Sequence, residues 1–311
     1  MKRSSMDIGI KGLNYSLGKI ESIDKVINNP DLLSKLRNKG LETFSNSELT
    51  PAELAYLSIN KTIESAGIDP KDIEVVVYAS TSFWRKNFYT EYDIAWLMHT
   101  LKLENAFPIG IFLPGCANAI NALHVAVNLV KADNYKNVLV VTTDKVNPES
   151  NDYRLMKPDI SILSDAASSF IVSCENDIDF KVDSIYHHSF PHMWNLDYEH
   201  DFVANLVATF KGSQIAIENI LKKSSLDYSE ISKIFMNNYN IPVIEMIGKK
   251  CGFSENQIYL NNVKKIAHAY ASDTLINMKD HIDSINIGKN EHFLLLGTGH
   301  KNWAGTVLTK T

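Results

Sequence analysis

Cys116 is the residue of this sequence best placed for nucleophilic chemistry. It follows the break Pro114-Gly115 and begins a segment, 116–130, in which apolar residues recur at helical spacing. A thiol in the first turn of a helix faces unpaired backbone N–H groups and the positive end of the helix dipole, which favour the thiolate that attacks carbonyls. Because the segment is apolar or small on most sides, we expect a buried helix. The alternative is an inert core thiol, since free cysteines are often buried.

The composition is that of a globular protein without a nucleic-acid surface. The chain has 311 residues and a net charge of −5, and its 31 Lys and Arg residues are scattered among 36 Asp and Glu residues. The three cysteines, Cys116, Cys174 and Cys251, show neither metal-type spacing nor even pairing, so a disulfide framework is not expected. No signal peptide and no apolar run of membrane-spanning length is found. We therefore expect a cytoplasmic protein without a membrane partner.

The order helix–turn–strand–loop–helix–strand occurs twice, which predicts two related α/β halves. Residues 1–175 are expected to form the half that carries the cysteine, and residues 176–311 the second half. The expected strands are 8–15, 73–79, 137–143, 233–236 and 292–298, and the expected helices include 51–65, 202–221 and a small-residue helix, 267–275. The first of these helices has a capping box, because Thr50 is followed three residues later by Glu53.

Duplication brings corresponding elements of the two halves face to face. The start of the Cys116 helix should then lie opposite His268, at the start of the small-residue helix. The loop after Met236, with Asn237, Asn238 and Asn240, and the segment 297–299 should end at the same cleft. A nucleophilic cysteine, a nearby histidine and backbone N–H donors are the groups that acyl transfer needs.

This pattern resembles the thiolase superfamily, specifically the β-ketoacyl-ACP synthase III group and its relatives in secondary metabolism. The resemblance covers nearly the whole chain. It is carried by the 66–70 turn and its strand, the Cys116 helix, Ser164-Asp165-Ala166, and Gly297-Thr298-Gly299 with Trp303. It implies a five-layered α-β-α-β-α fold from two duplicated halves, a homodimer, and an acyl group held as a thioester on the cysteine. The substrates would be acyl carrier protein or CoA thioesters, with no cofactor.

The resemblance also implies roles for residues. Cys116, His268 and Asn237 would be catalytic, and the backbone amides of Cys116 and Gly299 would form an oxyanion hole. Family members usually carry His-Gln-Ala-Asn where this sequence has Asn237-Asn-Tyr-Asn240, and an asparagine where it has His268, so the two residue types are exchanged. The segment 36–40 matches the family's nucleotide-binding segment poorly, which favours a carrier-protein thioester over CoA.

Other residues are candidates for substrate contacts: Asn238, Asn240, Phe83, Phe88 and His300. The loop 83–89 is expected to reach a partner's pocket across a dimer interface, or to be an ordinary surface loop. The segment 186–198 is expected to be an aromatic loop over the acyl pocket. Its histidines lie in no helix that could present a metal pair, so no metal site is predicted.

Three functions remain open from the sequence. The first is Claisen condensation of the acyl group on Cys116 with a carbanion from a second thioester or ketide, in fatty-acid or polyketide-type biosynthesis. The second is acyl transfer to an oxygen or nitrogen nucleophile, with His268 as the base. The third is a non-catalytic partner subunit, against which the retained Cys116 argues.

Overall fold

The computed structural model describes residues 7–81, 90–132, 135–147, 154–157, 159–197, 200–299 and 301–311. Its helices are α1 (Pro30–Asn38), α2 (Pro51–Ala66), α3 (Thr90–Thr100), α4 (Asn118–Ala132), α5 (Phe202–Ser224), α6 (Ile241–Lys250), α7 (Val263–Ile266) and α8 (Asp273–Ser284). Its strands are β1 (Gly9–Leu17), β2 (Lys19–Ser22), β3 (Thr43–Asn46), β4 (Val75–Ala79), β5 (Phe107–Ile111), β6 (Asn137–Asp144), β7 (Leu155–Met156), β8 (Ser161–Ile162), β9 (Ala166–Ser173), β10 (Phe180–Ser189), β11 (Ile231–Met236), β12 (His292–Gly299) and β13 (Asn302–Lys310).

Nine strands form one continuous sheet in the order β11-β12-β13-β10-β1-β9-β6-β4-β5. On one side of the β1–β10 junction, β4 and β6 are parallel, and β9 and β1 follow as antiparallel neighbours. On the other side, β11 and β12 are parallel, and β13 and β10 follow in the same way. The parallel neighbour β5 of β4 has its counterpart in the parallel bridge between Ile234 and Ile258. The two sides therefore repeat one arrangement of strands.

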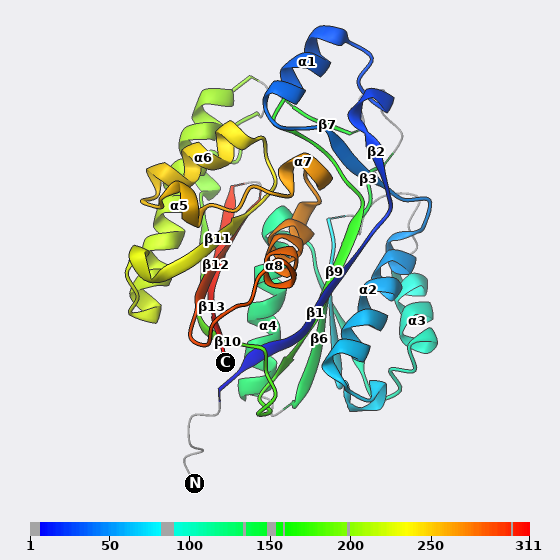
Figure 1. Cartoon of the computed structure of the whole chain (residues 1–311). Coiled ribbons are helices and arrows are strands. Elements are labelled where there is room, and N and C mark those ends of the chain that lie inside the picture. Colours follow the sequence, from blue (N-terminus) through cyan, green and yellow to red (C-terminus); the bar gives the residue numbers. More distant parts are fainter. Residues whose placement is uncertain are drawn as a thin grey trace.

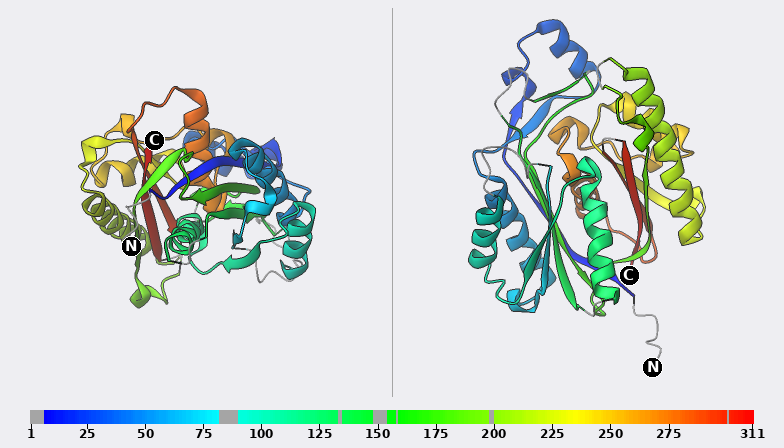
Figure 2. Two further views of the ribbon diagram at one scale, coloured as in Figure 1. Left: turned by 90° about the horizontal axis from the view of Figure 1, so that it is seen from below. Right: turned by 180° about the vertical axis from the view of Figure 1, so that it is seen from behind.

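The helices complete a five-layered α-β-α-β-α fold, as expected from the sequence. Helices α2 and α3 cover one outer face, and α5 and α6 cover the other. Helices α4 and α8 lie between the two halves of the sheet, where α4 contacts β6 and β12, and α8 contacts β1 and β11 (Figures 1 and 2). The predicted boundary at residue 175 falls between β9 and β10, and the division into two halves stays a prediction.

The central helices are held by apolar packing from both halves. Leu123 of α4 and Leu275 of α8 belong to the same buried cluster as Val140 of β6 and Leu295 of β12. Burying a leucine or valine side chain contributes about 1.5–3 kcal/mol, so this cluster fixes the starts of both helices relative to each other. Within the described part of the chain, no helix is both long and apolar enough to traverse a bilayer.

Most predicted elements are confirmed, including the capping box of Thr50 and Glu53 at the start of α2. Two predictions need correction, and one strand was missed. Residues 186–189 belong to β10, because they pair with β13, and are not part of a loop. The hairpin strand β13 was not predicted. The small-residue helix begins only at Asp273, because Ala267 and Tyr270 adopt positive φ angles of 56° and 53°.

Candidate active site

Cys116 lies in the turn that leads into α4. Gly115 adopts a φ of 58°, in the left-handed region that glycine enters without strain, and a single 3-10 turn over Gly115–Ala117 runs directly into α4. The amides of Gly115 and Ala117 donate to the carbonyls of Phe112 and Pro114. Among the described residues, no acceptor is found for the Cys116 amide. The thiol is half-buried, so it is shielded but can be reached.

His268 approaches Cys116 from the other half of the chain, as the sequence predicted. Its Nε2 lies 3.3 Å from the Cys116 Sγ. The histidine is held in place by its backbone: its amide donates to Ile162, and its carbonyl accepts from the amide of Ser164. The preceding Ala267 has a φ of 56° and a ψ of −143°, a conformation that costs a non-glycine residue about 1–3 kcal/mol. Strain of this kind persists where surrounding contacts fix the chain, and here it aims the imidazole at the thiol.

Asp273 holds the other side of the imidazole. His268 Nδ1 lies 2.5 Å from Asp273 Oδ2, and both side chains are buried. The carboxylate also accepts from the amide of Ala269 at 2.6 Å and from the amide of Asn238 at 2.8 Å. Because these donors fix both oxygens, Asp273 holds the proton on Nδ1 and presents Nε2 to the sulfur. Nucleophile, base and orienting carboxylate form the arrangement typical of an activated nucleophile.

Two opposing effects act on the charge of His268. Burial disfavours the imidazolium, but the Asp273 carboxylate and the Cys116 sulfur on either side of the ring outweigh burial and raise the pKa of His268. The raised pKa favours a proton on the imidazole beside an anionic sulfur. The geometry therefore places a proton-carrying imidazole within 3.3 Å of the Cys116 sulfur, where a proton can pass between the two groups.

Asn237 lies behind this pair. Its Nδ2 donates to the carbonyl of Tyr270 at 2.9 Å, and its Oδ1 accepts from the amide of Thr298 at 2.8 Å. The side chain is completely buried, and in the described structure it makes no hydrogen bond to Cys116 or His268. Asn237 thus ties the end of β11 to the turn that carries His268 and to β12.

Gly299, the second predicted oxyanion donor, passes very close to the nucleophile turn. A Cβ on Gly299 would lie 1.9 Å from the Pro114 carbonyl oxygen and 3.5 Å from the Cys116 nitrogen. The position therefore admits only glycine, and the backbones of Gly299 and Cys116 lie side by side. The oxyanion role of the two amides stays a prediction.

Two of the remaining predicted contact residues, Asn238 and Asn240, have other roles in the fold. Asn240 caps α6 by accepting from the amide of Val243 at 3.1 Å. Asn238 is buried, and its Oδ1 accepts from Asn277 Nδ2 at 2.8 Å. Neither lines the cavity at Cys116. The predictions for Phe83, Phe88 and His300 lie outside the described residues.

A cavity of about 110 Å³ opens onto Cys116. One wall is the face of α5 on which Phe202, Asn205, Leu206 and Thr209 recur at helical spacing. The rest of the lining consists of Met156, Lys157, Ile160, Tyr239, Val243, Thr298 and Gly299. Apart from Lys157 and a few neutral polar groups, the lining is apolar, which suits an uncharged acyl chain or the arm of a thioester.

Sequence reasoning missed Asp273 and Tyr239. Asp273 stands five residues after His268, and a carboxylate there could have been considered as the partner of the histidine. Tyr239 had no signal of its own, because an aromatic residue after a strand is usually part of the core. Its ring centroid lies 5.5 Å from that of His268.

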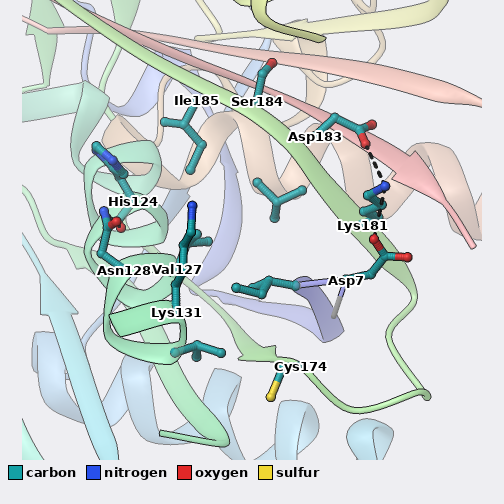
Figure 3. A pocket seen from close by; sticks show the side chains of 13 residues that line it. Asp7, His124, Val127, Asn128, Lys131, Cys174, Lys181, Asp183, Ser184 and Ile185 are labelled. Atoms are coloured by element: carbon teal, nitrogen blue, oxygen red, sulfur yellow. Dashed lines mark hydrogen bonds and ion pairs between the residues drawn. The ribbon is translucent and has the colours of Figure 1, made fainter. Parts of the chain in front are cut away.

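His187, from the segment predicted to be an aromatic loop, lies away from Cys116 and packs against α4. His187 of β10 stacks on His124 of α4, with Nε2 and Nδ1 2.6 Å apart. Burial lowers the pKa of both, that of His187 to about 4, so the pair is neutral at neutral pH. His124 borders an open groove of about 530 Å³ between α4 and β10, with Lys131 and Lys181 (Figure 3). In the described chain no three metal-ligating side chains cluster.

Comparisons with known proteins give consistent results. The family model described as 3-oxoacyl-[acyl-carrier-protein (ACP)] synthase III matches residues 113–188, and the model of its C-terminal part matches residues 221–310. The β-ketoacyl-[acyl-carrier-protein] synthase III of Fusobacterium nucleatum is 22% identical over 97% of this chain and 98% of its own.

Among solved structures, 3-oxoacyl-[acyl-carrier-protein] synthase III from Aquifex aeolicus superposes with a TM-score of 0.83 at 16% identity, covering 97% of this chain and 99% of that one. ChlB3, described as an acyltransferase, gives a TM-score of 0.84 at 16% identity, with 98% of each chain covered. At such identities, the structural likeness shows a shared fold.

Proposed function

This chain belongs to the 3-oxoacyl-[acyl-carrier-protein] synthase III family of the thiolase superfamily, and we propose that it is a condensing enzyme that carries its acyl substrate on Cys116. The observation that carries the proposal is the 3.3 Å contact between Cys116 Sγ and His268 Nε2 at the mouth of an apolar cavity.

In the first half-reaction, the Cys116 thiolate attacks the carbonyl carbon of an acyl thioester. The negative charge moves to the carbonyl oxygen, where the amides of Cys116 and Gly299 would stabilise it. When the tetrahedral species collapses, the carbon–sulfur bond to the donor breaks, and the donor thiolate takes the proton from the His268 imidazolium. The acyl group is now bound to Cys116, and His268 is neutral.

In the second half-reaction, a carbanion from a second thioester attacks the acyl group. Loss of CO₂ from a malonyl thioester would supply that carbanion, and the product would be a 3-oxoacyl thioester. Cys116 leaves as the thiolate, and uptake of one proton from solvent by His268 restores the starting state. The reaction as written uses acyl carrier protein or CoA thioesters and no cofactor.

A second candidate is transfer of the acyl group from Cys116 to an oxygen or nitrogen nucleophile. The observation that favours it is the 2.5 Å contact between His268 Nδ1 and Asp273, because neutral His268 with an orienting carboxylate is suited to take a proton from an incoming hydroxyl or amine. Asn237, at the position where family members usually carry a histidine, cannot accept a proton.

The assembly is proposed to be a homodimer. The edge strand β5 and the turn after it leave Phe107 43% and Leu113 76% exposed. An unpaired strand edge beside exposed apolar side chains is typical of a surface covered by a partner. A cytoplasmic location is proposed on the three free cysteines.

Intact-mass measurement tests the proposal. The protein is incubated with acetyl and longer acyl thioesters of a carrier protein, of CoA and of N-acetylcysteamine. We expect a mass gain of one acyl group that is absent in Cys116→Ala and retained in Cys174→Ala, the matched control at the other half-buried thiol. No gain with any donor would favour a non-catalytic partner subunit.

The acceptor is identified in a second step. Malonyl thioester or a panel of amines and alcohols is added to the acylated protein, and the products are identified. A 3-oxoacyl thioester identifies a condensing enzyme, and an ester or amide identifies an acyltransferase.

A further inference from the structure

Tyr239 brings a large side chain to the reacting groups. It follows β11 in a tight turn, in which the Tyr239 amide donates to the carbonyl of Asn237 at 2.9 Å. The side chain is half-buried and lines the same cavity as Cys116. Its ring is tilted by 38° to that of His268. The phenol therefore forms part of the cavity wall beside the imidazole.

Hydrogen bonds hold the ring in this position. Tyr239 Oη lies 2.6 Å from Thr298 Oγ1 and donates toward the Thr298 carbonyl at 3.2 Å. Thr298 is itself fixed, because its amide donates to Asn237 Oδ1 at 2.8 Å. To swing out of the cavity, the ring would have to leave an anchor on β12, directly before Gly299. The ring is a fixed wall of the cavity.

The volume of the cavity is small compared with the volume of the Tyr239 side chain. The cavity volume of about 110 Å³ is below the roughly 150 Å³ of an engineered cavity that binds benzene, so it admits groups smaller than a phenyl ring. A phenol is larger than that. Truncating Tyr239 would therefore enlarge the space at Cys116 by about as much as the cavity now offers.

We propose that Tyr239 limits the size of the group that reaches Cys116, so that the site accepts small substituents and excludes bulky ones next to the sulfur. That this group is an acyl chain or an acceptor rests on the proposed function, but the size limit itself is a property of the cavity. Tyr239 is here a specificity-determining residue and takes no proton in the reaction.

The test uses alkylation, which requires access to the thiol and no enzyme activity. Iodoacetamide and its N-ethyl, N-butyl and N-octyl derivatives are applied to wild type, Tyr239→Ala and Tyr239→Phe, and modification of Cys116 is followed by peptide mass mapping. In wild type, we expect the rate to fall steeply beyond the ethyl group. In Tyr239→Ala the ratio between the iodoacetamide and N-octyl rates should fall at least about tenfold. Tyr239→Phe keeps the ring but loses its anchor on Thr298, so its ratio should lie between those of wild type and Tyr239→Ala.

Two controls keep the result interpretable. Tyr56→Ala removes a tyrosine from α2, outside the cavity, and should leave the ratio unchanged. If Tyr239→Ala does not fold, as judged by its melting transition, Tyr239→Trp serves in its place and should move the size limit toward smaller reagents. A folded Tyr239→Ala with the wild-type ratio, or a Tyr239→Trp with the wild-type limit, overturns the proposal.

The same variants are then tested with acetyl, butyryl and octanoyl thioesters. We expect the rate of acylation by the octanoyl thioester, relative to the rate with the acetyl thioester, to be higher in Tyr239→Ala than in wild type. If no thioester acylates wild type while alkylation still depends on residue 239, the proposed function fails and the size limit stands. If thioesters acylate wild type and neither series responds to residue 239, the size limit fails and the proposed function stands.

Discussion

Replacing Asp273 by asparagine tests the arrangement of Cys116, His268 and Asp273 most directly. The carboxylate accepts three hydrogen bonds: from His268 Nδ1 at 2.5 Å, from the Ala269 amide at 2.6 Å and from the Asn238 amide at 2.8 Å. Asparagine has one oxygen, so its NH₂ group must face either the Ala269 amide or both His268 Nδ1 and the Asn238 amide. An NH₂ facing His268 would favour the tautomer whose proton is on Nε2, which cannot take a proton from the thiol.

We expect the acylation rate of Cys116 to fall by about 10²- to 10⁴-fold in Asp273→Asn, the range associated with loss of a general base and of its orienting carboxylate. The variant should still fold. One mispaired buried group costs about 1–3 kcal/mol, which is less than the 5–15 kcal/mol of a typical native protein. The removed charge is also the larger of the two influences that raise the pKa of His268, ahead of the Cys116 sulfur, so this pKa should fall.

Two measurements on the same samples check this. Intact-mass kinetics give the acylation rate, and ¹⁵N-imidazole resonances give the protonation of His268 against pH. Asp280→Asn is the matched control, because Asp280 is on the same helix and accepts from the Tyr15 hydroxyl at 2.6 Å. It should change neither measurement. A folded Asp273→Asn with the wild-type rate and the wild-type His268 titration would refute the reasoning.

Three further predictions follow from single contacts. Gly299→Ala should lower the melting temperature and abolish acylation, because the new Cβ would lie 1.9 Å from the Pro114 oxygen; a wild-type rate would contradict this. Asn237→Ala should cost about 1–3 kcal/mol in denaturant unfolding, because it leaves the Thr298 amide and the Tyr270 carbonyl without their partner; unchanged stability would show that these bonds contribute nothing net. The folded-state pKa of His187, about 4, is below its ordinary 6.5, so the unfolded chain binds this proton first. Stability should therefore fall as the pH drops from 6.5 to 4, by at most about 3 kcal/mol and by less because the ring is partly exposed to solvent. The fall should be smaller in His187→Gln, as measured by urea unfolding against pH.

The repeated order of helices and strands could be predicted from the sequence, because apolar periodicity and turn residues are local signals. They identified the strands 73–79 and 137–143 and the helix at Thr50, which the structure has as β4, β6 and α2. The facing of Cys116 and His268 was predictable for a different reason. Once two halves repeat, corresponding helix starts must meet, and the structure places the two side chains in contact.

The path of the chain around His268 was not predictable. The residue types at 267–275 favour a helix, but the helix begins only at Asp273, because Ala267 and Tyr270 adopt positive φ angles. Neither alanine nor tyrosine signals such angles. Tertiary hydrogen bonds to Ile162 and Ser164 impose them, and these partners are distant in the sequence. This turn lets the side chain of Asp273 reach back to His268. Because the turn could not be predicted, the role of Asp273 could not be predicted either.

The duplication explains how one imidazole comes to lie between two acidic groups. Cys116 stands in the turn that enters α4, and Asp273 is the first residue of α8, the corresponding central helix of the other half. Each helix presents its positive end to its own acidic group, the thiol or the carboxylate. His268 bridges the two, with Nε2 at 3.3 Å from the sulfur and Nδ1 at 2.5 Å from the carboxylate. Because both helix starts and both acidic groups act on the same ring, removing the charge of Asp273 should alter the reactivity of a thiol that it does not touch.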